Sequence, residues 1–163
     1  MDRLWTPWRY RYVSTGVPGG SCIFCEKAAS SDDRGNYVVL RAERNFAILN
    51  LYPYTSGHLM IAPYEHVATL GEAPQETLQE MMRLTTRAEQ ALRQLYNPDG
   101  LNIGMNIGQS AGAGVAGHIH MHVLPRWTGD GSFMTTVSET RVLPETLERT
   151  YERLKTALSA TAS

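Results

Sequence analysis

The sequence predicts an α+β fold, in which helices pack against a largely antiparallel sheet of about five strands. The chain has 163 residues, of which 42% are hydrophobic and 19% charged, a composition typical of one globular domain. Short β-type runs are followed by a long amphipathic helix, more β-type runs and a last helix. We therefore expect an irregular arm over residues 1–20, a core over residues 21–127, and an extension with a helix over residues 128–163 that belongs to the same domain.

Three short runs form the first half of the predicted sheet. A turn cluster at residues 31–36 precedes β-type runs at residues 37–40 and 46–49. A third run covers residues 58–62 and is stopped by Pro63, because proline has no N–H to donate to a neighbouring strand. This order predicts three strands before the first long helix.

The strongest helix signal spans residues 74–96. A proline stands at its first position, where the missing N–H costs nothing. Apolar residues recur behind it at helical spacing, namely Leu78, Met81, Met82, Ala88, Ala91, Leu92 and Leu95. A turn of sequence Asn-Pro-Asp-Gly at residues 97–100 ends the helix. Two more strands are predicted over residues 101–107 and 118–124, and a last helix over residues 144–158.

Composition excludes several classes of protein. The 15 basic and 16 acidic side chains give a net charge of -1, which argues against a protein that coats nucleic acid. No stretch approaches the roughly 18 consecutive apolar residues of a membrane span, and residues 1–9 lack the apolar region of a signal peptide. Two cysteines, Cys22 and Cys25, cannot form a disulfide framework. We expect a cytoplasmic protein.

The segment from His118 to Val123 alternates histidine with an apolar residue. In a strand, residues i, i+2 and i+4 face the same side, so His118, His120 and His122 line one surface. A structural role, a metal site and nucleophilic catalysis by imidazole are the three interpretations. A flat strand spreads the first and third rings over about 13 Å, too far for all three to bind one ion. No acidic residue lies nearby in the sequence to complete a hydrolytic metal site, which favours the nucleophile.

This alternation resembles the signature of the histidine triad superfamily of nucleotide hydrolases and transferases. The resemblance extends through residues 50–63 and 106–110 and ends in the Val-Leu-Pro-Arg-Trp of residues 123–127. The opening Asp-Arg-Leu-Trp-Thr-Pro-Trp-Arg and the Pro-Arg-Trp ending are most similar to the diadenosine tetraphosphate phosphorylase branch. The resemblance to the superfamily covers roughly residues 20–127. The family resemblance therefore implies a nucleotide-processing enzyme.

The resemblance implies a role for each histidine of the catalytic group. The middle residue, His120, would attack the α-phosphate and form a nucleotidyl-histidine, with its second ring nitrogen bonded to a backbone carbonyl. His122 would hydrogen-bond a phosphate oxygen or the leaving oxygen. His58 matches the upstream histidine that joins this network, although it could also be a plain core residue.

Substrate-binding residues are expected around this group. Side-chain amides and hydroxyls, and the backbone N–H groups of the glycine-rich loop, can approach a phosphate or ribose closely. Hydrolases of the family often have a Gly-Gln pair shortly before the triad, where this chain has Ala113 and Gly114, and that departure slightly favours an acceptor other than water. The expected substrate-binding residues are Asn50, Asn106, Gln109, Ser110, Gly114 and Trp127.

The C-x-x-C pair of Cys22 and Cys25 has three interpretations: a redox pair, half of a zinc site, or two inert thiols. No βαβ pattern surrounds it, which argues against the redox pair. Zinc-bearing members of the superfamily use two cysteines, a histidine and the first triad histidine, which correspond to Cys22, Cys25, His66 and His118. Two thiolates and two imidazoles make a closed structural zinc site. Mg²⁺ commonly accompanies polyphosphate substrates but is not required by the sequence.

The sequence and its resemblance together predict an enzyme that cleaves a dinucleoside polyphosphate at the α-phosphate. Phosphorolysis of diadenosine tetraphosphate to ADP and ATP is the favoured reaction, and hydrolysis of a dinucleoside polyphosphate or a phosphoramidate is the alternative. A nucleotide-binding signalling module with weak turnover, or an enzyme acting on adenylated DNA ends, would belong to another class. Near-zero net charge argues against nucleic acid. Family members usually dimerise, and we expect a homodimer that uses the helix over residues 74–96.

Overall fold

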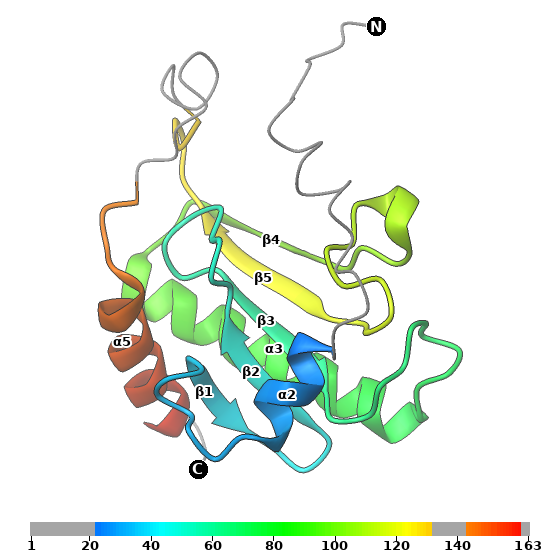
Figure 1. The fold of residues 1–163 in the computed structure, drawn as a ribbon. Helices are drawn as coiled ribbons and strands as arrows, with labels where there is room; N and C mark the ends of the chain where they lie inside the picture. Colours follow the sequence, from blue (N-terminus) through cyan, green and yellow to red (C-terminus); the bar gives the residue numbers. More distant parts are fainter. Residues whose placement is uncertain (1–21, 132–142, 161–163) are drawn as a thin grey trace, which may run out of the picture.

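The computed structural model describes residues 22–131 and 143–160, and it confirms the α+β fold (Figure 1). The described residues form one five-stranded antiparallel sheet with the strand order β1-β2-β3-β5-β4. The arm predicted over residues 1–20, with Trp5 and Trp8, lies outside the described residues, as does part of the predicted extension. No helix of the described part is long and apolar enough to cross a membrane.

The first three strands form an antiparallel meander. They are β1 (Val38–Arg41), β2 (Asn45–Leu49) and β3 (Leu59–Pro63). All five residues of β2 are buried, as expected for a strand covered on both faces. The long connection between β2 and β3 carries Asn50 and His58, which the backbone joins through a hydrogen bond from Asn50 N–H to His58 C=O. The predicted strands at residues 37–40, 46–49 and 58–62 therefore differ from the observed bounds by about one residue.

The second half of the sheet is a pair of strands after the long helix. Helix α3 (Gln75–Tyr96) ends at Asn97, whose φ of 43° is left-handed and lets the chain turn into β4 (Gly100–Gly104). Strand β5 (Met121–Arg126) pairs with both β4 and β3, and the short 3-10 helix η1 (Gln109–Ala111) lies in the loop between β4 and β5. Strand β5 thus begins three residues later than the predicted strand over residues 118–124, and His118 and His120 precede it.

The two faces of the sheet are covered unequally. Helices α3 and α5 (Leu147–Ala160) pack on one face and enclose the larger core, which includes Leu59, Ile61 and Val123. The other face carries a smaller core around Phe24 of α2 (Ile23–Ala29), a helix that the sequence analysis did not predict. Figure 1 shows α2 in front of the sheet, opposite α3. One face of the sheet is therefore left partly open, and the histidines lie there.

Candidate functional site

Phe24 of helix α2 packs against two of the three triad histidines. Its ring centroid lies 5.2 Å from that of His118 and 4.8 Å from that of His120. Phe24, His118 and His120 are all nearly excluded from solvent. The short helix therefore covers the start of the histidine segment and removes water from both rings.

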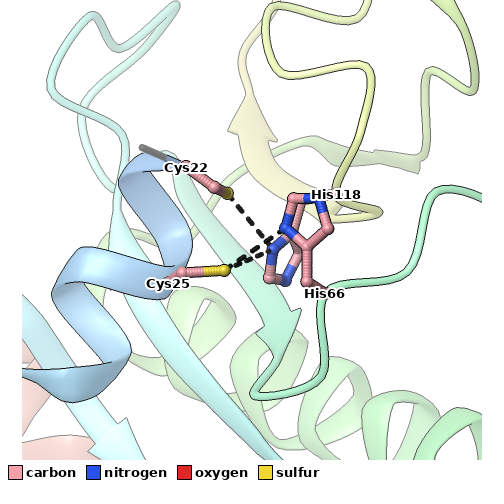
Figure 2. A group of neighbouring side chains, drawn as sticks. All are labelled: Cys22, Cys25, His66 and His118. Atoms are coloured by element: carbon pink, nitrogen blue, oxygen red, sulfur yellow. Dashed lines mark hydrogen bonds between the residues drawn. The ribbon is translucent and has the colours of Figure 1, made fainter. Parts of the chain in front are cut away.

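His118 belongs to a cluster with Cys22, Cys25 and His66 (Figure 2). Its Nε2 lies 2.9 Å from the carbonyl oxygen of Pro63 and must carry the proton, because a carbonyl can only accept. In the neutral ring this leaves a lone pair on Nδ1, which faces the sulfurs of Cys22 at 3.3 Å and Cys25 at 3.6 Å. The Cys25 sulfur is also 3.3 Å from His66 Nδ1. Two sulfurs and two imidazole nitrogens thus converge on one point.

These spacings fit a tetrahedral metal ion. The four donor atoms lie within 4.8 Å of one another. Zn–S and Zn–N bonds of about 2.3 and 2.0 Å place neighbouring ligand atoms about 3.3–3.8 Å apart in a tetrahedron. The three hydrogen-bond distances fall in that interval at 3.3, 3.3 and 3.6 Å. Burial and the neighbouring Cys22 raise the pKa of the Cys25 thiol. The cluster could hold a metal ion, whose charge would favour thiolates.

His120 uses the opposite nitrogen. Its Nδ1 lies 2.8 Å from the backbone carbonyl of His118, so Nδ1 carries the proton and Nε2 keeps a lone pair. Burial lowers the pKa of His120, which keeps the ring neutral at physiological pH. A neutral imidazole with an unprotonated Nε2 is a nucleophile or a general base.

His58 and His122 form a second pair beside it. The backbone N–H of Tyr54 donates to His58 Nδ1 at 3.2 Å, so the proton of neutral His58 is on Nε2. Nε2 lies 3.0 Å from His122 Nδ1, which must accept, and this leaves neutral His122 protonated at its own Nε2. Burial, followed by the charge of His120, lowers the pKa of His122 to about 4. The chain of donors from Tyr54 N–H therefore ends in an N–H that faces away from His58.

Gly57 explains how His58 reaches this position. Its φ of +85° is left-handed, and a Cβ built on it would lie 2.9 Å from Cδ2 of Leu92 and 3.1 Å from Cε2 of Tyr96. Only glycine lets the loop between β2 and β3 approach helix α3 so closely. The backbone then enters β3 with His58 directed at His122 across the sheet.

A groove of about 460 Å³ begins at His122 and extends beside β4 and β5. We call it the β5 groove. Its walls come from the loop between β2 and β3, from β4 and the residues after it, and from the turn after β5. The lining residues are Tyr54, Thr55, Asn102, Ile103, Gly104, Met105, Asn106, His122, Leu124, Arg126, Asp130 and Gly131.

Of the residues predicted to bind substrate, one lines the β5 groove and the others lie in neighbouring loops or pack elsewhere. Asn106 lines the β5 groove. Asn50 has its Nδ2 3.4 Å from His58 Nδ1, and its Oδ1 accepts the N–H of Tyr52 at 3.0 Å, so it orders the loop that carries His58. Gln109 and Ser110 lie in η1, and Gly114 follows in the same loop. The ring of Trp127 packs against Tyr96, with centroids 6.4 Å apart, outside the residues that line the groove.

Three further residues of the site were missed in the sequence. Phe24 lies between the two cysteines, Tyr54 orients His58 through its N–H and lies with its ring centroid 4.9 Å from that of His58, and Arg126 closes the far end of the groove. Only Arg126 had a usable signal, because alternation places it on the same face as His122.

Comparisons with known proteins agree on one family. The family model described as the HIT domain matches residues 33–129, which include all five histidines of the chain. The curated AP-4-A phosphorylase of Mycobacterium tuberculosis is 38% identical over 164 residues, covering 96% of this chain and 84% of that protein. Protein hit of Bacillus subtilis is 33% identical over 112 residues, covering 68% of this chain and 75% of that protein.

A solved structure agrees with these relatives. The Zn-bound histidine triad family protein of Mycobacterium smegmatis superimposes with a TM-score of 0.70 at 34% identity, covering 86% of this chain and 94% of that one. A hypothetical histidine triad nucleotide-binding protein of Sulfolobus tokodaii gives a TM-score of 0.66 at 28% identity, covering 85% and 93%. The sequence and the fold therefore lead to the same group of proteins.

Proposed function

The chain belongs to the HIT domain family, and we propose that it is a nucleotidyl transferase that cleaves diadenosine tetraphosphate at an α-phosphate with inorganic phosphate as the acceptor. The observation that carries the proposal is the His120 ring, whose Nδ1–H donates to the carbonyl of His118 at 2.8 Å. That bond leaves a neutral, buried imidazole with a lone pair on Nε2, which is the state that a nucleophile needs.

The first step forms a covalent intermediate. His120 Nε2 attacks the α-phosphorus, an N–P bond forms, and the P–O bond to the leaving group breaks. The bonding electron pair departs with the leaving oxygen, so the leaving group is ATP. The proton stays on His120 Nδ1, and its hydrogen bond to the His118 carbonyl stabilises the positive charge that the ring acquires.

The pair of His58 and His122 supports that step. The hydrogen bond of 3.0 Å from His58 Nε2 to His122 Nδ1 fixes the proton of His122 on Nε2. That N–H donates to the oxygen on which negative charge develops, and no proton has to leave the pair. His58 is held in turn by the backbone of Tyr54, so it acts as a positioning residue.

The second step releases the nucleotide. An oxygen of inorganic phosphate attacks the α-phosphorus from the side that ATP has vacated, and the N–P electron pair returns to His120 Nε2. The product is ADP, and the enzyme is restored. The identity of 38% to the AP-4-A phosphorylase of M. tuberculosis, together with Ala113 and Gly114 in place of the Gly-Gln pair, supports phosphate over water.

We propose that the cluster of Cys22, Cys25, His66 and His118 holds zinc. Two thiolates and two imidazoles complete a tetrahedral ion and leave no position for substrate, so zinc would supply stability and not chemistry. The M. smegmatis relative described as Zn-bound supports this assignment. We propose that Mg²⁺ is bound only with a polyphosphate substrate.

The substrate contacts are also proposals. Asn106 lines the β5 groove, and Gln109, Ser110 and Gly114 lie in the loop beside it, where amides and hydroxyls could contact phosphate or ribose. Asn50 adjoins His58 and can do so from the other side. Trp127 could contribute only through its packing on Tyr96. A homodimer through α3, whose Met82 is 55% exposed, and a cytoplasmic location stay predictions.

The test is to incubate the protein with diadenosine tetraphosphate, with and without inorganic phosphate, and to separate the products. We expect ADP and ATP, formed only when phosphate is present. AMP and ATP formed without phosphate would establish a hydrolase instead. Binding of nucleotide without turnover under both conditions would favour a signalling module and overturn the proposal.

A further inference from the structure

Arg126 lies on the same face of β5 as His122. Side chains alternate along a strand, so His122, Leu124 and Arg126 share one face, and all three line the β5 groove. Four residues at about 3.3 Å each separate the Cα atoms of His122 and Arg126 by roughly 13 Å. The histidine segment therefore continues, through one apolar residue, to a cation at the far end of an open groove.

The guanidinium of Arg126 is held in place before any ligand arrives. Nε donates to Asp130 Oδ2 at 2.5 Å, Nη2 to Asp130 Oδ1 at 2.7 Å, and Nη1 to Asn102 Oδ1 at 2.6 Å. Asp130 is fixed by the backbone N–H of Trp127 at 3.2 Å. These three bonds use three of the five N–H donors of an arginine. The side chain of Arg126 is 46% exposed, so its remaining donors can be reached from the groove.

This arrangement suits a chain of phosphates. A guanidinium binds phosphate through paired hydrogen bonds, and one that is already oriented loses little conformational freedom on binding. On this face of β5, His122 offers an N–H donor at one end and Leu124, between it and Arg126, offers none; Asn106 also lines the groove. A leaving group must therefore be long and anionic to contact both His122 and Arg126.

We propose that the β5 groove is the subsite for the leaving polyphosphate and that Arg126 is the residue that selects such leaving groups. This inference rests on the proposed function, because it assumes attack by His120 on an α-phosphate. The phosphates beyond the scissile P–O bond lie along the groove, and Arg126 binds them in the substrate and in the transition state alike. Interactions of that kind lower KM and leave kcat nearly unchanged.

The test compares two substrates that present the same adenylyl group. Diadenosine tetraphosphate has a leaving group long enough to reach Arg126, whereas adenosine phosphoramidate has one too small to do so. We expect Arg126→Ala to raise KM for the tetraphosphate roughly 10- to 100-fold, in line with a lost hydrogen bond to a charged group, with kcat changed less than threefold. KM and kcat for the phosphoramidate stay within about twofold of the wild type.

Two further variants separate charge from geometry. Arg126→Ala leaves the carboxylate of Asp130 without its main partner, and that negative charge would itself repel phosphate. A double variant, Arg126→Ala with Asp130→Asn, removes this repulsion, and we expect it to keep most of the increase in KM. Arg126→Lys, which keeps the charge but not the planar fork, should fall between Arg126→Ala and the wild type.

Arg93→Ala is the matched control. Arg93 is exposed on α3 and paired with Glu89, away from the groove, so Arg93→Ala should change KM and kcat for neither substrate. Equal losses on both substrates, no loss on either, or recovery of the wild-type KM in the double variant would overturn the proposal for Arg126. If the wild-type protein converts neither substrate, the proposed function itself has failed. Thermal denaturation of each variant establishes that it is folded.

Discussion

His118 and His120 are two residues apart and chemically identical, yet the fold gives them opposite chemistry. His118 donates from Nε2 to the carbonyl of Pro63 and directs Nδ1 at the two cysteines. His120 donates from Nδ1 to the carbonyl of His118 and keeps Nε2 unprotonated. Both rings are buried beneath Phe24, so solvent does not distinguish them. The difference lies in which carbonyl each ring meets.

Two backbone oxygens therefore decide which histidine is the proposed metal ligand and which is the proposed nucleophile. Pro63 ends β3, and its carbonyl is available because the strand stops there. The carbonyl of His118 is available because β5 begins only at Met121. The irregular backbone just before the strand thus supplies the acceptor that fixes the tautomer of His120.

The largest effect should come from removing the nucleophile. His120→Ala leaves no atom to form the N–P bond, so we expect turnover of diadenosine tetraphosphate to fall about 10⁴-fold or more. Product formation measured by chromatography checks this. Metal content and Tm should stay near those of the wild type, because the cluster of Cys22, Cys25, His66 and His118 is intact. Turnover within tenfold of the wild type would contradict a covalent role for His120.

A smaller effect on turnover is expected from a change in the cluster proposed to hold zinc. Cys25→Ala removes one of the four proposed zinc ligands, so bound zinc measured by elemental analysis should fall well below one ion per chain. At free zinc near 100 times Kd, the lost binding is worth about 2.7 kcal/mol, or roughly 5–10 °C in Tm. We expect kcat to fall about 10- to 100-fold, because His118 also supplies the carbonyl that holds His120.

Ala29→Ser, an exposed change at the end of the same helix, is the control for Cys25→Ala. It should alter neither zinc content nor kcat. If Cys25→Ala loses zinc but retains full kcat, the metal cluster and His120 are independent. The hydrogen bond from His120 to the His118 carbonyl would then not link zinc binding to turnover.

A change at Phe24 should lower both kcat and zinc retention, each by less than Cys25→Ala does. Phe24→Leu keeps an apolar side chain but loses the ring that contacts His118 and His120. We expect a loss in unfolding free energy of about 1.5 kcal/mol or less, a few-fold fall in kcat and weaker retention of zinc. Chemical denaturation, kinetics and competition with a chelator measure the three effects. A change in only one of kcat and zinc retention would mean that Phe24 supports one histidine alone.

A further prediction concerns acid stability and leaves kcat and zinc content aside. The pKa of His122 in the fold is about 4, whereas an unfolded histidine titrates near about 6.5. Between about pH 6.5 and pH 4 the unfolded chain therefore binds more protons than the folded one. The contribution of His122 to the free energy of unfolding is intact above about pH 6.5 and falls as the pH drops toward 4. We expect His122→Gln, which does not titrate, to lose less Tm between pH 7 and pH 4.5 than the wild type. The same slope in both proteins would contradict a buried neutral His122.

Periodicity and spacing were sufficient to predict most of the sheet. Alternation placed His118, His120 and His122 on one side, and hydrophobic spacing located α3 almost to the residue. The four residues expected around zinc do converge, although that set came from the family resemblance. Helix α2 was missed because seven residues give too little periodicity to distinguish a helix from a loop.

Other features of the site depend on contacts that no local pattern contains. The tautomers of His118 and His120 follow from hydrogen bonds to the carbonyls of Pro63 and His118. Pro63 ends β3 and His118 precedes β5, so only the folded sheet brings these groups together. Asn50 was expected at a ribose, and its amide is also bonded within its own loop. Trp127 was expected at the substrate, and its ring, directly after the end of β5, packs against Tyr96 of α3.

The pairing of β3 with β5 has a consequence for the order in which the protein folds. The other neighbours in the sheet follow one another directly in the order of strands along the chain, whereas β3 and β5 are separated by α3, β4 and the loop that follows. Closing that distance costs the most chain entropy, so we expect this seam to form late. Cys22, Cys25, His58 and His66 lie on one side of it, and His118, His120 and His122 on the other. A chain still emerging during synthesis would therefore have neither a complete metal site nor a reactive histidine until its last strand is in place.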